Sequence, residues 1–172
     1  PSMLKLDPPD HSRIRKLVQY GFTNRYITSL EPEIKKIVED CLDKIHNQDS
    51  FDLIEDLAKP LPAIVIAKMM GLPNEDLDQF QAWSEDLLVG VGGIGTSRED
   101  IKRSGDAYEA LINYFERIIL ARRDSPGDDF IGKLIQAEEE GDKLNIKEMY
   151  GTCLLLLIAG HETTTRLIGN GM

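Results

Sequence analysis

The most constraining feature of the chain is the segment 154–165, which reads LLLLIAGHETTT. Here an apolar run gives way to small residues, then to an acid and three hydroxyl groups. Upstream, Asn145 and Glu148 have the spacing of a helix N-cap and its reciprocal partner. Between residues 146 and 158 the apolar positions cover more than one face, which predicts a helix that runs through a core. Polar groups at the end of such a helix are costly to bury unless they are hydrogen-bonded or used in function.

Four residues of this segment predict a site on the helix. Gly160 weakens the helix and leaves room for a group to approach the backbone. Thr163 follows Ala159 by four residues, so its hydroxyl can compete for the Ala159 carbonyl and open or bend the turn. Glu162 lies beside that turn as a candidate proton donor or acceptor. Together these residues predict a helix that holds a small ligand and a water.

Two other interpretations of the same segment stand beside this one. A buried threonine often bonds back to its own helix, and a glycine often only permits close helix packing, which explains the pattern equally well. His161 and Glu162 also match the first half of the zinc motif HExxH, but residue 165 is a threonine, so the second ligand is missing. A metal-dependent hydrolase is therefore the least favoured interpretation.

The net charge and the cysteines limit the classes of function. The 172 residues carry a formal net charge of −10, which argues against general nucleic-acid binding and against adhesion to an anionic membrane. Cys41 and Cys153 fall on apolar helix faces without any metal-binding spacing, as expected of buried thiols in a reducing compartment. The 172 residues contain no signal-peptide pattern, and their longest apolar run is too short to span a membrane. We therefore expect a cytoplasmic protein.

A second candidate site lies near the start of the sequence. We expect Asp7 to cap a helix that has Pro8 in its first turn. His11 and Arg15 are four residues apart and therefore share one face of this helix. Two donors on one face suit a carboxylate or phosphate partner. If only the spacing is considered, a basic helix face exposed to solvent is a better explanation than a binding site.

The rest of the chain is also predicted to be mainly helical. Residues 50–54 are ambiguous, with a strand fragment as one interpretation. Residues 90–95 hold four glycines, which predict a flexible connection without the features of a phosphate-binding loop. No internal repeat or domain boundary is visible, so we expect a single domain over residues 1–172. Apolar residues at a three-to-four-residue period predict helices over residues 30–45, 63–70, 74–91, 97–123 and 128–140.

Two separated motifs resemble cytochrome P450. Residues 159–164, AGHETT, resemble the signature of the long I helix that lies over the haem. Residues 7–18, DPPDHSRIRKLV, with GFT at 21–23, resemble the C-helix region of soluble, bacterial-type P450s. The Pro-Leu-Pro at 60–62 and the glycine-rich residues 90–95 resemble the E helix and the F–G loop over the substrate channel. The resemblance implies a mainly α, partial P450 fold from the C helix into the I helix, lacking the N-terminal part and the C-terminal haem-thiolate half.

The resemblance implies a haem-dependent monooxygenase that activates O2 to hydroxylate or epoxidise a hydrophobic small molecule. The implied cofactor is haem b (iron protoporphyrin IX), with electrons ultimately from NAD(P)H. His11 and Arg15 would bind the haem propionates. Ala159 and Gly160 would form the groove in which O2 sits.

The resemblance also implies roles in proton delivery, electron transfer and substrate binding. Glu162 and Thr163 would organise water and deliver the protons needed for O–O cleavage. The implied redox partner is a ferredoxin with its ferredoxin reductase, and Arg13 and Lys16, which lie off the propionate face, would contact an acidic ferredoxin. The candidate substrate contacts are apolar: Leu155, Leu156, Ile158, Leu88 and Val91.

The sequence departs from the family in one important respect. The iron ligand of P450s is a cysteine thiolate, which lies in a loop near the C-terminus after an E-x-x-R helix. Neither segment occurs here, and neither Cys41 nor Cys153 lies in a comparable sequence, so we assign no iron ligand within the chain. We expect an incomplete part of an enzyme that is inactive alone. The alternative from another class is a truncated, non-enzymatic helical interaction module without haem.

Overall fold

The computed structural model describes residues 3–46, 49–90, 96–139 and 141–171. Within these ranges the chain is mainly helical, as predicted. The α-helices are α1 (Asp10–Gln19), α2 (Asn24–Ser29), α3 (Glu31–Ile45), α4 (Pro60–Met69), α5 (Leu77–Val89), α6 (Arg98–Ala121), α7 (Phe130–Gln136) and α8 (Ile146–Gly171). The short elements are the 3-10 helices η1 (Met3–Lys5), η2 (Tyr20–Phe22) and η4 (Asn74–Asp76), the π-helix η3 (Leu53–Ala58), and the strands β1 (Glu138–Glu139) and β2 (Asp142–Lys143).

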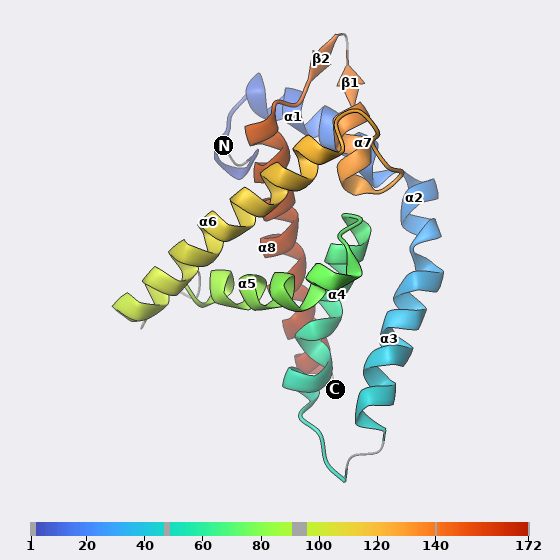
Figure 1. Cartoon of the computed structure of the whole chain (residues 1–172), viewed down its shortest axis with the longest axis vertical. Helices are drawn as coiled ribbons and strands as arrows, with labels where there is room; N and C mark the ends of the chain where they lie inside the picture. The colour runs from blue at the N-terminus through green and yellow to red at the C-terminus, as the bar shows by residue number, and fades with distance from the viewer. Residues whose placement is uncertain (1–2, 47–48, 91–95, 140, 172) are drawn as a thin grey trace.

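Helix α8 runs through the middle of the molecule, as Figure 1 shows. It packs against α4, α5, α6 and α7. A capping box fixes its start: the Glu148 N–H donates to Asn145 Oδ1 over 3.0 Å, and the Asn145 N–H donates to Glu148 Oε2 over 2.9 Å. These reciprocal bonds confirm the predicted start of the helix, because they satisfy N–H groups that the first turn leaves free. Neither α8 nor any other helix in the described ranges is long and apolar enough to cross a bilayer.

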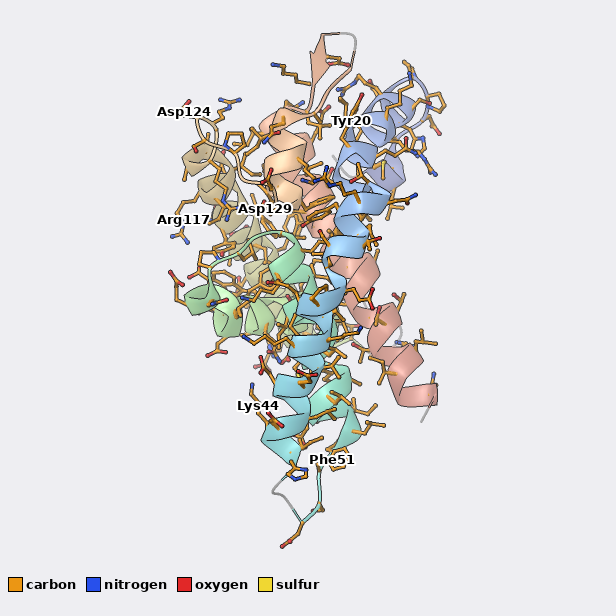
Figure 2. The ribbon with its side chains drawn as sticks, turned by 90° about the vertical axis from the view of Figure 1, so that its right-hand side faces the viewer. Tyr20, Lys44, Phe51, Arg117, Asp124 and Asp129 are labelled. Atoms are coloured by element: carbon orange, nitrogen blue, oxygen red, sulfur yellow. The ribbon has the colours of Figure 1, made fainter. Side chains whose placement is uncertain are left out.

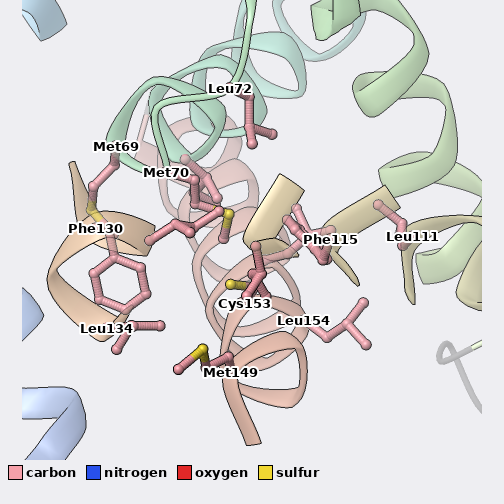
Figure 3. Packing of buried hydrophobic residues seen from close by; sticks show 14 of the residues in the cluster. Met69, Met70, Leu72, Leu111, Phe115, Phe130, Leu134, Met149, Cys153 and Leu154 are labelled. Atoms are coloured by element: carbon pink, nitrogen blue, oxygen red, sulfur yellow. The ribbon is translucent and has the colours of Figure 1, made fainter. Parts of the chain in front are cut away.

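The apolar core surrounds the first half of α8. Cys153, Leu154 and Leu157 of this helix are buried. Burying one such leucine contributes about 1.5–3 kcal/mol to the stability of the fold. Figure 3 shows the side chains around this part of α8, which come from α6, α7, the last residue of α4 and the segment just after it: Met69, Met70, Leu72, Leu111, Phe115, Phe130 and Leu134.

Helix α3 stands along one side of the molecule and lies against α4. Ile37, Cys41 and Ile45 form its buried stripe, as the three-to-four-residue period predicted. Figure 2 looks onto this helix, with Lys44 near its lower end and Phe51 on the segment that leads toward α4. Helix α3 is therefore an amphipathic cover outside the central core.

Arg122 joins the ends of three helices. Its guanidinium donates to the carbonyl oxygens of Met70 and Gly71, just after α4, and its Nη1 lies 2.9 Å from Asp129 Oδ2. Asp129, labelled in Figure 2, caps α7 by accepting from the Gly132 N–H over 2.9 Å. Gly71 has a φ of +69°, a left-handed conformation that is typical of the residue that ends a helix. The guanidinium thus satisfies carbonyls that the end of a helix leaves free.

The predicted start of the first helix is wrong. Helix α1 begins at Asp10 with Pro9 as its N-cap residue, and no side chain caps it. The backbone carbonyl of Asp7, not its side chain, accepts from the His11 N–H over 3.1 Å. A proline disfavours the helical conformation of the residue before it, so Pro9 favours a helix that begins after Pro8.

Two other predicted elements differ from the structure. Residues 50–54 form no strand, because Asp52 Oδ1 accepts from the Ile54 and Glu55 N–H groups and starts η3 instead. The helix predicted over residues 128–140 is shorter, since α7 ends at Gln136 and β1 pairs antiparallel with β2. Gly141, with a φ of +81°, makes the turn that this pairing needs.

Candidate functional site

One face of α8 carries the residues predicted to face a ligand. The intervals of four residues between Leu155, Ala159 and Thr163 place the three side chains along one face of the helix. Leu155 is half-buried, whereas Ala159 and Thr163 are exposed. The Thr163 hydroxyl donates to the Ala159 carbonyl over 2.6 Å, which confirms the predicted bond. Helix α8 nevertheless continues without interruption through this turn, so the predicted opening of the turn is absent.

Glu162 forms an ion pair that the sequence reasoning missed. Its Oε1 accepts a charge-assisted hydrogen bond from Arg166 Nη2, one turn further along α8. The Glu162 side chain is 35% exposed, so the carboxylate is in contact with solvent as well as with the guanidinium. The spacing of four residues between an acid and an arginine is a signal that could have identified this pair from the sequence.

His161 points to the other side of α8 and is buried, with 2% of its surface exposed. Its Nε2 lies 3.1 Å from the Lys59 carbonyl oxygen. Because a carbonyl can only accept, Nε2 carries the proton in this contact. Burial lowers the pKa of the imidazole from its ordinary value, since removal from water disfavours the charged form. Among the described residues, Nδ1 is buried without a hydrogen-bond partner.

A cavity of about 370 Å³ lies beside His161, between α5 and α8. Its lining includes Leu88 of α5 and Glu162, Thr165 and Arg166 of α8. The structure therefore brings the predicted substrate contact Leu88 next to the predicted proton donor Glu162. Val91, the other candidate from that segment, lies outside the described residues, as do residues 92–95 of the glycine-rich stretch.

The other predicted substrate contacts lie on the preceding turns of α8. Leu155, Leu156 and Ile158 are half-buried, and the last two pack against the core. None of the three lines the cavity that contains Leu88. The described contacts therefore lie in two places, with Leu88 of α5 beside the cavity and the other three on α8.

The space beside Gly160 is used for helix packing. A Cβ atom built at this position would lie 3.0 Å from Ile66 Cδ1 of α4. The group that approaches the α8 backbone here is thus the Ile66 side chain. Ala159, on the exposed face, is the part of the predicted O2 groove that is open to a ligand.

Helix α1 presents two predicted donors without partners. His11 is half-buried and Arg15 is exposed, and no contact within the described ranges engages either side chain in a hydrogen bond or ion pair. They lie one turn apart on one face, which is the arrangement expected for binding a carboxylate. The propionate-binding role of the pair stays a prediction.

Arg13 makes contacts within the chain that the sequence did not predict. Its Nη2 donates to Glu148 Oε1 at the start of α8, and its Nε lies 3.5 Å from Asp142 Oδ2. The side chain is 30% exposed, so most of it is used inside the chain. The contact of Arg13 with a ferredoxin stays a prediction, as does that of Lys16, which is exposed.

The two cysteines are buried thiols. Cys41 and Cys153 are both free, and burial raises the pKa of Cys153 to about 12. Burial also raises the pKa of Cys41. Within the described ranges, no group of three or more metal-binding side chains occurs. A neutral thiol in an apolar core is a packing residue.

Comparisons with known proteins identify close relatives of the chain. No family model matches it. The chain is 40% identical over 168 residues to a cytochrome P450 from Bacillus subtilis (strain 168), a match that covers 98% of the chain and 40% of that relative. It is 39% identical over 173 residues to a vitamin D(3) 25-hydroxylase from Pseudonocardia autotrophica, covering 100% of the chain and 41% of the relative.

Solved structures of similar fold give the same result. The ligand-free cytochrome P450 TbtJ1 aligns with a TM-score of 0.91 at 38% identity, over 98% of the chain and 44% of that protein. CYP109E1 from Bacillus megaterium, solved in complex with testosterone, aligns with a TM-score of 0.87 at 39% identity, over 95% of the chain and 43% of that protein. The chain thus spans about two fifths of the length of the curated relatives it matches.

Proposed function

The chain belongs to the cytochrome P450 family, and we propose that it supplies the distal helix and the propionate-binding helix of a haem-dependent monooxygenase. The observation that carries this proposal is the exposed Thr163 hydroxyl, bonded to Ala159 and next to the half-exposed carboxylate of Glu162. This acid and alcohol lie in a chain that shares 40% identity with a bacterial P450 over nearly its whole length.

The hydrogen bond of Thr163 determines what its hydroxyl can do. The hydrogen is donated to the Ala159 carbonyl, so the oxygen is left to accept hydrogen bonds from the exposed side of α8. A water on that side would donate to this oxygen. We assign Thr163 the role of orienting such a donor, and Glu162 the role of supplying protons from solvent as a general acid.

The residues present fit a haem group. When bound, haem b would supply the activation of O2, with electrons that come ultimately from NAD(P)H. His11 and Arg15 would hold the propionates, because both are donors on one face of α1 without partners in the described ranges. Ala159 would leave space for O2 next to α8.

The iron ligand requires a separate proposal. A P450 holds its iron through a cysteine thiolate, whereas Cys41 and Cys153 are buried thiols of raised pKa. We propose that the ligand comes from a part of the protein beyond these residues, since the chain spans about two fifths of its relatives. The catalytic unit is then the complete protein, in which this chain forms one side of the haem pocket.

The proposed substrate is a hydrophobic small molecule, which the enzyme would hydroxylate or epoxidise. The half-buried Leu155, Leu156 and Ile158 would contact it. Two relatives support this substrate class, namely the vitamin D(3) 25-hydroxylase and the P450 solved with testosterone. The proposed electron donor is a ferredoxin with its reductase, approaching the exposed Lys16. Free, buried thiols are consistent with a cytoplasmic location.

The proposal is tested with the full-length protein, a ferredoxin, its reductase and NADPH. Steroids and other apolar compounds are incubated under isotopically labelled O2, and the products are examined by mass spectrometry. We expect one labelled oxygen atom in a product that forms only when all components are present. A haem-loaded protein that oxidises none of the compounds, or whose product oxygen comes from water, would contradict the proposed reaction.

A further inference from the structure

Arg13 makes a long-range polar contact that the proposed chemistry does not use. Its Nη2 donates to Glu148 Oε1, a residue 135 positions further along the chain. Its Nε also lies 3.5 Å from Asp142 Oδ2 of β2. Figure 1 shows α1 and the start of α8 together with the β1–β2 hairpin at one end of the molecule. Arg13 therefore links three segments that are separate in the sequence.

The Glu148 carboxylate, which accepts the hydrogen bond from Arg13, is fixed in position. The Glu148 side chain is only 7% exposed. Its second oxygen, Oε2, accepts from the Asn145 N–H over 2.9 Å, as part of the capping box at the start of α8. Both oxygens thus have partners, and the carboxylate cannot turn without breaking the cap. A buried charge fixed in this way is a firm anchor for an arginine.

The position of Arg13 on α1 relates it to the propionate-binding face. It lies two residues from both His11 and Arg15, and at about 100° per residue it points to roughly the opposite side of the helix from them. Helix α1 otherwise lies mainly against η1, η2 and β1, and its buried apolar residues are Ile14, Leu17 and Val18. The Arg13 contact therefore adds a polar constraint on the rotation of α1 about its own axis.

We propose that Arg13 is a positioning residue for haem binding: its ion pair with Glu148 fixes the rotation of α1 relative to α8 and thereby aims His11 and Arg15 at the propionates. This inference rests on the proposed function. It requires that Arg13 act through the propionate contacts and not through global stability. Loss of Arg13 leaves the apolar contacts of α1 in place, so the helix stays docked while its donor face loses its fixed direction.

The test measures haem dissociation from the full-length holoprotein, by transfer of haem to an excess of apomyoglobin. Arg13→Met should raise the dissociation rate about tenfold, the size typical of losing a residue that orients a ligand. Arg13→Lys should raise it less, because the ammonium keeps the charge but loses the planar fork. Arg122→Met is the matched control: it removes a part-buried arginine paired with Asp129 and should lower the urea midpoint of unfolding without a comparable change in haem loss.

A double-mutant comparison separates positioning from a general effect on stability. In a His11→Ala/Arg15→Met background, Arg13→Met should add little to the rate of haem loss, because both contacts that it positions are already gone. An equal increase in both backgrounds would overturn the inference, as would unchanged haem loss in Arg13→Met. If Arg13→Met does not fold, Arg13→Lys and Glu148→Gln carry the same comparison. A wild-type full-length protein that binds no haem would contradict the proposed function itself.

Discussion

The hydroxyl of Thr163 donates a hydrogen bond to the carbonyl oxygen of Ala159 over 2.6 Å, one turn back along α8. This bond uses the only hydrogen of the hydroxyl and leaves its oxygen as an acceptor on an exposed face. The relationship explains how an ordinary side chain-to-backbone contact can also orient a donor bound beside the helix. It does so without interrupting the helix.

Replacing Thr163 by alanine should uncouple electron transfer from product formation. The variant loses the acceptor that orients a donor beside α8, so more of the NADPH consumed should end as peroxide. The ratio of peroxide to oxidised product, measured in the full-length protein, is the relevant quantity. Thr163→Ser should give a ratio close to that of the wild type because it keeps the hydroxyl. Thr164→Ala, at an exposed neighbouring position, is the control. Unchanged coupling in Thr163→Ala would contradict the assigned role.

Replacing Glu162 by glutamine should slow turnover by about 100-fold, the lower end of what general acid–base catalysis contributes. Glutamine is similar in size to glutamate, but its amide cannot act as a general acid as a carboxyl group can. The solvent isotope effect on turnover should increase, since proton supply becomes limiting. Arg166→Met is the control: it removes the ion pair and keeps the carboxylate, so its effect should be far smaller. Equal losses in the two variants would show that the ion pair, not proton transfer, matters.

Alanine should stabilise the protein less at Gly160 than at Gly105. Each glycine lies inside a helix, where alanine is favoured by roughly 0.5–1 kcal/mol. A Cβ at Gly105 would meet no atom within 4 Å, whereas one at Gly160 would lie 3.0 Å from Ile66 Cδ1. Urea unfolding should therefore show a gain for Gly105→Ala that Gly160→Ala does not match. Shortening the neighbour, with Ile66→Val, should make Gly160→Ala more favourable, and equal gains at both glycines would contradict this packing.

The stability of the fold should fall as the pH is lowered below about 6.5, the ordinary pKa of histidine, in part because of His161. Its folded pKa is lowered by burial, so in this range the unfolded chain binds a proton that the folded chain does not. The contribution is at most about 1.4 kcal/mol per pH unit. His161→Gln should reduce this slope in urea titrations at several pH values, while His46→Gln, at an exposed position, should leave it largely unchanged. A slope that His161→Gln leaves intact would assign the pH dependence to other groups.

The sequence predicted the parts of the fold that depend on local patterns. Periodic apolar residues located α3, α4, α5 and α6, whereas the short helix α2 was not predicted. The spacing of Asn145 and Glu148 identified the capping box that the structure contains. The hydrogen bond from Thr163 to Ala159 was also predictable, because it follows from a spacing of four residues. Local reasoning failed at Asp7, where two successive prolines delay the helix.

Contacts between distant segments could not be predicted from the sequence. His161 and Lys59 are 102 residues apart, and Arg13 and Glu148 are 135 apart. Whether two such residues meet depends on how the helices pack, which no short pattern encodes. The packing also decided that Ile66 occupies the space beside Gly160.

The most direct test of the central claim is the absorption spectrum of the reduced full-length protein under carbon monoxide. We predict haem binding in one-to-one stoichiometry, with the strongly red-shifted Soret band that thiolate ligation gives to the ferrous carbonyl complex. This result would show the thiolate-bound haem that the roles proposed for α8 require. A protein that takes up no haem, or whose carbonyl complex has the spectrum of an imidazole-ligated haem, would contradict the account.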